Sequence, residues 1–264
     1  MDSLIARALR HIGHLVIDGV WRLGYASRFF VLVLIRSRLS FRRFGLTIRE
    51  IYFAGVLSLI IILVSGLFVG MVLGLQGFDT LQRYGSAEAV GTLVALSLVR
   101  ELGPVVSALL FASRAGSAMT AEIGLMKATE QITALDMMAV DPISRIVGPR
   151  FWGGVISMPL LAALFSAMGV FGGYLIAVVL LGVDSGAFWS QMQASVDLRD
   201  DVMNGVIKSF VFGVAVTAIA LFEGYDAPPT AEGVSGATTR TVVTSSLAVL
   251  AIDFVLTAFM FRGI

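Results

Sequence analysis

Four ionisable residues lie inside long apolar stretches of this sequence. Arg100 and Glu101 are adjacent, Lys208 lies in a later stretch, and Asp253 lies in the last one. Charged side chains are costly in hydrocarbon, so they tend to face a cavity or one another. Neighbouring residues on a helix point about 100° apart, so Arg100 and Glu101 each need a partner elsewhere. We expect Arg100 and Glu101 to serve a functional cavity and Lys208 and Asp253 to form a structural ion pair, with the reverse assignment open for each pair.

The same inventory excludes most catalytic chemistry. The chain has no cysteine, and its two histidines, His11 and His14, lie near the N-terminus, so we expect no metal site and no intramembrane Ser-His pair. We expect Glu101 and Asp253 to lie at different depths, which argues against an intramembrane aspartyl protease. No GxxxxGK[ST] phosphate loop is present, so we expect no ATPase activity in this chain. The net charge of +1 gives no case for nucleic acid.

The composition places these charges in a membrane protein. Of the 264 residues, 57% are hydrophobic and 14% are charged, and the mean hydropathy is +0.91. Soluble domains have about 45–50% apolar and about 25% charged residues. A helix of about 20 apolar residues crosses a bilayer, and helices satisfy every backbone group in lipid. The fold class is therefore predicted to be an all-α integral membrane protein, with five spans over residues 51–78, 89–113, 151–183, 204–222 and 241–261.

Basic residues predict the orientation of the spans. Residues 1–50, the 114–150 connection and Arg240 together hold 14 arginines and lysines, whereas the opposite side holds three. The positive-inside rule then places the N-terminus in the cytoplasm and the C-terminus outside. We expect residues 1–45 to form interfacial amphipathic helices, including a short apolar run over 29–35 that beds into the cytoplasmic leaflet, and residues 46–264 to form one transmembrane domain.

The connections carry further elements. Residues 120–138 alternate apolar and polar positions as an amphipathic cytoplasmic helix does, which either lies on the membrane or docks a partner. A short outer helix is predicted over 185–200. The 223–240 connection contains Pro228-Pro229 and is expected to be irregular.

Small residues and prolines mark helix contacts and bends. Gly66, Gly70 and Gly74 are four residues apart, a spacing that lets helix backbones approach closely, either within one chain or at a dimer or cavity wall. Gly103-Pro104 and Pro159 are expected to kink their helices.

Two long motifs carry a family resemblance. The run from Leu93 to Arg150 contains RELGPVVSALLFASRAGSAMTAE, and GYDAPPTAEGVSGATTRTVV follows at Gly224–Val243. Both resemble the signatures of the MlaE permease family, and the resemblance extends over nearly the whole chain.

This resemblance implies the membrane subunit of an ABC transporter for phospholipids that maintains outer-membrane lipid asymmetry. It implies a homodimer in the bacterial inner membrane with a periplasmic C-terminus. The implied partners are the ATPase MlaF, the STAS-domain protein MlaB and a hexamer of the MCE protein MlaD. ATP and Mg²⁺ would be bound by the ATPase, so no cofactor is expected on this chain.

The resemblance also implies roles for single residues. A lipid cavity at the dimer interface would place Leu73, Leu81 and Tyr84 against the lipid, with Arg100 and Glu101 as its deep polar pair. Lys208, Arg240 and Asp253 match charged positions of the family. The 120–138 segment would be the coupling helix that docks on the ATPase, through Glu122, Met126, Lys127 and Glu130.

Two other functions compete with ABC transport. An ion-coupled secondary transporter would use Glu101 and Asp253 as proton carriers, but such proteins usually show paired halves, and this sequence shows no internal repeat. A membrane scaffold that transports nothing would have no need for buried charges.

Overall fold

The computed structural model of the protein describes residues 4–37 and 44–261. Within these residues the regular elements are all helices. Five helical segments of this described part are long and apolar enough to cross a membrane, which confirms the predicted all-α membrane class. They cover Gly45–Arg83, Ala87–Ala128, Ile143–Leu180, Arg199–Asp226 and Ala231–Met260.

Each span consists of one or more consecutive helices, and three further helices lie outside the spans. The first span contains α2 (Phe44–Ala54) and α3 (Leu59–Arg83), and the second contains α4 (Val90–Ser97), α5 (Gly103–Phe111) and α6 (Ser117–Ala128). The last three spans contain α8 (Gly148–Tyr174), α10 (Met203–Asp226) and α11 (Ala231–Phe261). The helices outside the spans are α1 (Leu4–Ser37), α7 (Gln131–Met137) and α9 (Ser185–Ser195).

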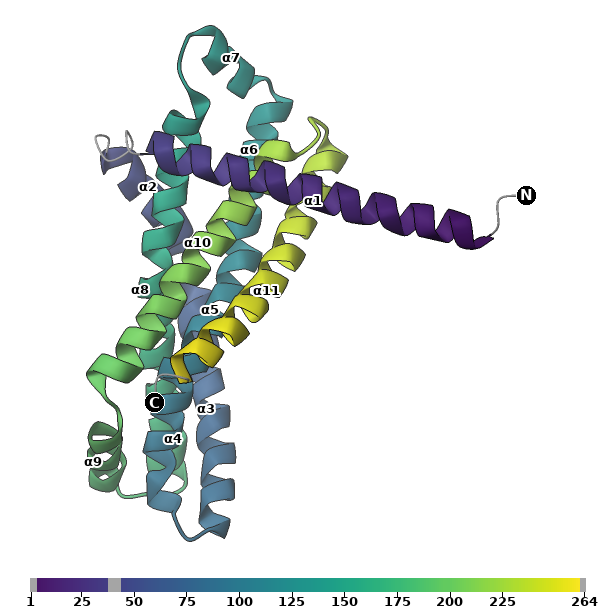
Figure 1. Cartoon of the computed structure of the whole chain (residues 1–264). Helices are drawn as coiled ribbons and strands as arrows, with labels where there is room; N and C mark the ends of the chain where they lie inside the picture. The colour runs from purple at the N-terminus through teal and green to yellow at the C-terminus, as the bar shows by residue number, and fades with distance from the viewer. Residues whose placement is uncertain (1–3, 38–43, 262–264) are drawn as a thin grey trace.

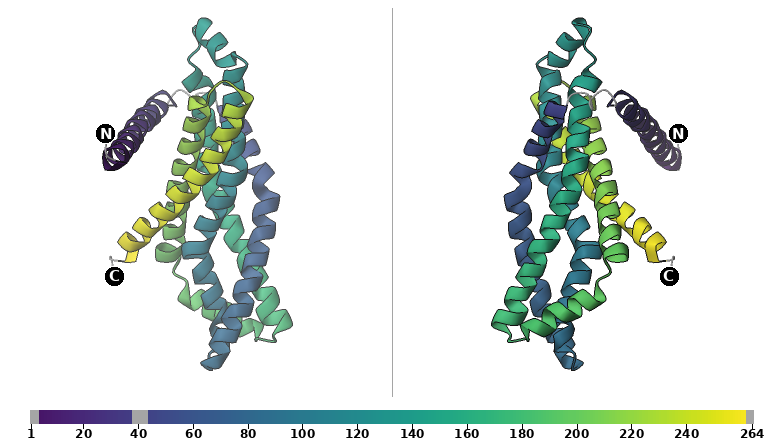
Figure 2. Two further views of the ribbon diagram at one scale, coloured as in Figure 1. Left: turned by 90° about the vertical axis from the view of Figure 1, so that its right-hand side faces the viewer. Right: turned by 90° about the vertical axis from the view of Figure 1, so that its left-hand side faces the viewer.

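The helices form an elongated bundle with distinct ends (Figure 1). α7 lies at one end, called here the α7 end, and α9 lies toward the other, called the α9 end. α1 crosses the bundle near the α7 end and extends well beyond it. Figure 2 shows α11 diverging from the other helices toward its C-terminus. This divergence leaves one side of α11 exposed, with bare apolar residues such as Leu247, Phe254 and Phe259.

The glycine spacing of α3 packs this helix against α8. A Cβ atom on Gly70 would overlap the backbone carbonyl of Gly169, and one on Gly66 would lie 2.7 Å from the carbonyl oxygen of Phe165. Only hydrogen at these positions allows the two backbones to approach so closely. The glycines therefore pack within one chain, the first of the two alternatives that the sequence left open.

The second span is interrupted at the Gly103-Pro104 pair. A π-helical turn, Leu98–Leu102, joins α4 to α5, and the Gly103 N–H donates to the carbonyl of Leu98. Pro104 has no N–H to offer to the carbonyl four residues earlier, which favours such a wider turn. Arg100 and Glu101 lie within this turn, a feature that is frequent at functional sites. Pro159, in contrast, lies inside the continuous helix α8.

The N-terminal segment forms one long helix up to Ser37. The apolar run over 29–35 belongs to α1, and part of it packs against protein. Phe29 is buried, with its ring centroid 5.9 Å from that of Phe222 and 5.3 Å from that of Tyr225. α1 is thereby attached to the C-terminal part of α10.

Three predicted connections have different bounds in the structure. The 120–138 segment is two helices, α6 and α7, because Glu130 adopts a left-handed conformation with φ of 58° between them. The outer helix is α9, followed by a π-helical turn at Leu198–Val202. The expectation of an irregular 223–240 connection is wrong, since only residues 227–230 separate α10 from α11. The hydroxyl of Thr230 accepts the N–H of Gly233 at 3.0 Å, which lets α11 start directly after the prolines.

Candidate functional site

A cluster of charged side chains joins the second, fourth and fifth spans. The Nζ atom of Lys208, on α10, lies 2.6 Å from a carboxylate oxygen of Glu101 and 3.2 Å from Oδ1 of Asp253. It also donates to the hydroxyl of Thr257 on α11 at 2.7 Å. These four residues form what we call the Lys208 cluster, a polar centre that joins three membrane spans.

The three charged groups of the Lys208 cluster differ in burial, and their charges do not balance. The Lys208 side chain is 2% exposed, whereas that of Glu101 is 35% exposed and that of Asp253 is 21% exposed. One ammonium faces two carboxylates, so the cluster carries a net negative charge when all three groups are ionised. A buried ammonium needs such partners, because an uncompensated charge in a low-dielectric interior is costly.

The cluster confirms one sequence prediction and corrects another. Lys208 and Asp253 do come into ion-pair range. The expectation that Glu101 and Asp253 lie at different depths is wrong, because both reach the same lysine. The π-helical turn and the oblique path of α11 bring them together, and neither feature follows from counting residues along a span.

Arg100 turns to a different partner. Its Nε donates to Oδ1 of Asp201 at 2.5 Å, and its Nη2 also contacts this carboxylate. Asp201 is 1% exposed, and its second oxygen accepts the backbone N–H of Asp197 at 2.8 Å. The Arg100 side chain remains 38% exposed. Sequence reasoning missed Asp201, although the acidic run just before the fourth span was the available signal.

An apolar cavity lies beside this ion pair. It has a volume of about 550 Å³ and lies between α8, α9, α10 and the second span. Val99 and Val202, the neighbours of Arg100 and Asp201, are among its lining residues, whereas Arg100 and Asp201 are not.

The three predicted acyl-chain contacts lie elsewhere, on or next to α3. Leu73 and Leu81 are half-buried against the hydrophobic core, and Tyr84 is 80% exposed directly after the last turn of α3. None of the three lines the 550 Å³ cavity.

Three of the four predicted coupling residues contact other helices, and the fourth is exposed. Glu122 accepts from Nη2 of Arg150 at 2.9 Å, and Met126 approaches the same guanidinium. Lys127 donates to the backbone carbonyl of Tyr225 at 2.8 Å. Glu130 is exposed at the start of α7. The first three therefore connect α6 to α8 and α10.

Exposed apolar side chains gather beside Glu130. Leu125 on α6 is 59% exposed, Met137 at the end of α7 is 79% exposed, and Met138 is 64% exposed. Together they define the α7 tip. Of the three, only Met138 falls on the apolar positions of the pattern over 120–138; Leu125 and Met137 lie outside it, so hydrophobic periodicity does not predict their exposure.

Glu223 is the ionic centre of the α7 end. It is 5% exposed in its side chain and accepts from Arg22 of α1 at 2.7 Å and from Nε of Arg240 of α11 at 2.9 Å. Arg240 thus has a structural partner, and α1 is joined to α10 by charge as well as by aromatic contacts.

Comparisons with known proteins agree on one family. Residues 47–259 match the family model described as "Permease MlaE". The chain is 57% identical over 258 residues to the intermembrane phospholipid transport system permease protein MlaE of Haemophilus influenzae, covering 98% of this chain and 99% of that protein. It is 37% identical over 218 residues to a probable ABC transporter permease protein of Rickettsia typhi, covering 83% and 84%. A probable ABC transporter permease protein of Synechocystis is 35% identical over 249 residues, covering 92% and 93%.

Proposed function

Because the chain belongs to the MlaE permease family, we propose that it is the membrane permease of an ABC transporter that moves phospholipids. In this proposal the lipids pass between the inner membrane and a periplasmic MCE-protein partner, MlaD, which maintains outer-membrane lipid asymmetry. The observation that carries the proposal is the Lys208 cluster: three helices place ionisable groups inside membrane spans and leave Glu101 partly exposed. Such groups are usually found where a polar substrate passes.

Arg100 supplies the group that fits a lipid phosphate. A guanidinium donates two hydrogen bonds in parallel to a phosphate or carboxylate. Asp201 engages Nε and Nη2 of Arg100, which leaves Nη1 for a phosphate oxygen. Glu101 lies next to Arg100 in the π-helical turn. Closure of the lipid cavity at the dimer interface changes the solvation of both side chains. In a homodimer, Leu73, Leu81 and Tyr84 then contact acyl chains at the dimer interface.

ATP drives this cycle from another chain. The sequence has no phosphate-binding loop, so the ATPase MlaF binds ATP and Mg²⁺ and this chain binds no cofactor. The α7 tip is the surface that supports docking, because its apolar residues are exposed: Leu125 lies at the end of the second span, and Met137 and Met138 lie beyond it. MlaB completes the assembly on the side of the ATPase.

The orientation follows from the same assignment. The α7 end holds most of the arginines outside the spans and faces the cytoplasm. The α9 end and the C-terminus then face the periplasm of a Gram-negative bacterium.

The ABC assignment is tested by the mass of the assembly. We expect native mass spectrometry of the complex from its own membrane to show two copies of this chain, two of the ATPase and bound phospholipid. Met137→Asp with Met138→Asp places charge on the α7 tip and should release the ATPase. Thr133→Asp, exposed on α7 but outside the tip, is the matched control and should leave the ATPase bound.

The alternatives predict other masses. A secondary transporter would move lipid without an ATPase, and a scaffold would carry no bound lipid. An assembly that retains its ATPase in the Met137→Asp/Met138→Asp variant would contradict docking at the α7 tip.

A further inference from the structure

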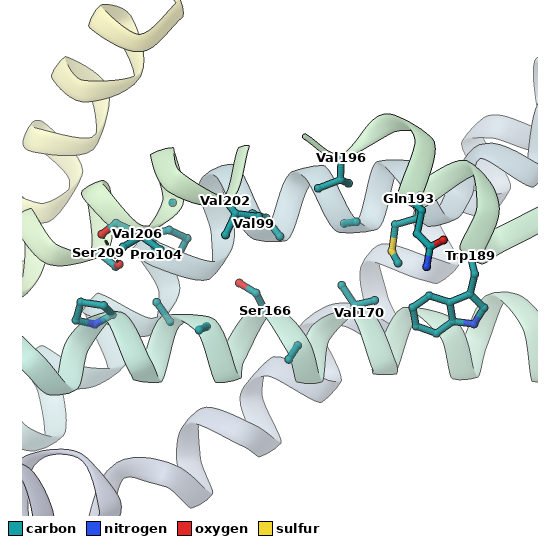
Figure 3. Close-up of a pocket in the computed structure, with 17 residues that line it drawn as sticks. Val99, Pro104, Ser166, Val170, Trp189, Gln193, Val196, Val202, Val206 and Ser209 are labelled. Carbon is teal, nitrogen blue, oxygen red and sulfur yellow. Dashed lines mark hydrogen bonds between the residues drawn. The ribbon is translucent and has the colours of Figure 1, made fainter. Parts of the chain in front are cut away.

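The 550 Å³ cavity beside the Arg100–Asp201 pair is elongated along α8. Ser166 and Val170 of α8 line one wall, and Val99 and Val206 line the opposite wall (Figure 3). Pro159 of α8 is also among the lining residues. No residue of the Lys208 cluster lines it. The cavity is therefore a feature separate from the charged site.

The length of the cavity matches one leaflet of a bilayer. Pro159 and Val170 are eleven positions apart on α8, which corresponds to roughly 16 Å of helix rise. Half of the hydrocarbon core of a bilayer is about 15 Å. Pro159 lies near the middle of the Ile143–Leu180 span, and the opposite end of the cavity is lined by α9. The cavity thus extends from mid-membrane to one membrane surface.

The interior of the cavity offers no free polar group. Among its lining residues, the Ser166 hydroxyl donates to the carbonyl of Leu98 at 3.3 Å, and the Ser209 hydroxyl donates to the carbonyl of Val206 at 2.9 Å. The rest of the inner wall is alanine, glycine, valine and proline. An apolar occupant leaves every one of these groups satisfied.

Free donors occur at the α9 end instead. Figure 3 shows the indole of Trp189 and the amide of Gln193 over this end of the cavity. Neither group has a hydrogen-bond partner within residues 4–37 and 44–261. Tryptophan is enriched at the membrane interface, where its ring lies at headgroup level. An occupant is therefore apolar along its length and carries acceptors at the interfacial end.

We propose that this cavity binds one acyl chain of a phospholipid from the leaflet at the α9 end. The ester carbonyl of the lipid accepts from Gln193 and Trp189, and the chain lies along Ala163 and Ala167. The size of the cavity agrees with this, since ligand pockets measure about 300–1,000 Å³. The proposal does not depend on transport or on an ATPase.

A transmembrane helix of another protein fits the cavity less well. Backbone carbonyls inside a helix are already bonded within it, so a passing helix would leave Trp189 and Gln193 without acceptors. An ester carbonyl has no such internal partner. The small side chains of Ala163 and Ala167 are exposed along the wall, which leaves room for a narrow methylene chain.

Photolabelling in nanodiscs tests the proposal. The intact complex is mixed with a phospholipid that carries a diazirine on its acyl chain, and the adducts are mapped by peptide mass spectrometry. We expect adducts on the residues of α8 and α10 that line the cavity. Ala167→Phe fills the cavity and should reduce these adducts about tenfold, the loss that corresponds to displacing roughly two CH₂ groups. Leu164→Phe, 40% exposed on the same helix but outside the cavity, is the control and should leave them unchanged.

Two results would overturn the proposal. One is labelling of the cavity residues that stays the same in Ala167→Phe. If this variant is poorly produced, the smaller substitution Ala163→Val takes its place in the same assay. The other is a protein occupant. Ala167→Cys gives the cysteine-free chain a single thiol, and a short cross-linker that joins this thiol to another membrane protein would show a helix in place of lipid. Loss of ATP-dependent transport would change neither readout, so failure here differs from failure of the proposed function.

Discussion

Replacement of Lys208 by methionine tests how the charged cluster holds the bundle together. Methionine keeps the length and apolar stem of the side chain but removes the ammonium. Glu101 and Asp253 are then left facing each other without a cation, and Thr257 loses its donor. Removing one partner of a buried ion pair destabilises by about 3–5 kcal/mol.

The expected loss lies at the lower end of this range. Glu101 and Asp253 are partly exposed, so water screens part of their repulsion, and we expect about 3 kcal/mol. For a chain of this size, that corresponds to a fall of roughly 6–12 °C in the melting temperature. The assay is thermal unfolding in detergent followed by tryptophan fluorescence, with Lys127→Met as the control. Lys127 donates to a backbone carbonyl and pairs with no carboxylate in the described part of the chain, so its loss should cost much less.

A triple variant without any charge in the cluster tests whether the loss of stability comes from unpaired carboxylates. Lys208→Met combined with Glu101→Gln and Asp253→Asn removes all three charges, and complete removal of a buried ion cluster is often nearly neutral. We expect this triple variant to recover at least half of the lost stability. A single Lys208→Met variant that melts like the parent, or a triple variant no more stable than the single one, would show that the cluster is not held by its charges.

Three further perturbations follow from contacts elsewhere. Gly70→Ala places a methyl group onto a backbone carbonyl of α8 and should destabilise by about 1–3 kcal/mol, whereas Gly24→Ala meets nothing within 4 Å and should be neutral or slightly stabilising in the same melt. Arg100→Ala leaves the buried carboxylate of Asp201 without a cation, whereas Asp201→Asn leaves an arginine that is 38% exposed. We therefore expect Arg100→Ala to cost more stability, and equal losses would contradict this ranking. Glu223→Gln should raise hydrogen exchange in α1, since two arginines lose their shared anion, and unchanged exchange would show that aromatic packing alone holds the helix.

Much of the fold could be predicted from the sequence because membrane spans depend on local composition. Long apolar runs must be helical in lipid, and the structure has the five spans. The ends of the helices were predicted less accurately, because they depend on capping and on local backbone conformation. Pro228-Pro229 suggested a long irregular connection, but Thr230 begins a new helix immediately. Glu130 divides one predicted helix into two through a backbone conformation that a glutamate rarely adopts.

The candidate site was harder to predict because its partners are far apart in the chain. The need of Arg100 and Glu101 for separate partners followed from helix geometry, and the structure supplies Asp201 and Lys208. The identity of these partners depends on a π-helical turn and on the crossing of α11. Neither can be read from hydropathy, since both arise from packing between spans. The cavity along α8 also arises from packing between spans. The sequence did not predict it, because small residues in a span usually indicate close contact between helices.

Phospholipid transfer by the reconstituted complex tests the proposed ATP-driven transport. Proteoliposomes that contain this chain with the proposed ATPase and the proposed MCE-protein partner are given labelled phospholipid. Transfer of the lipid to or from the MCE protein is followed with ATP, without nucleotide and with a non-hydrolysable analogue. We predict transfer only with ATP, and at least tenfold slower transfer in both Arg100→Ala and Glu101→Ala. Transfer at the same rate without ATP, or unimpaired transfer in both variants, would contradict the account.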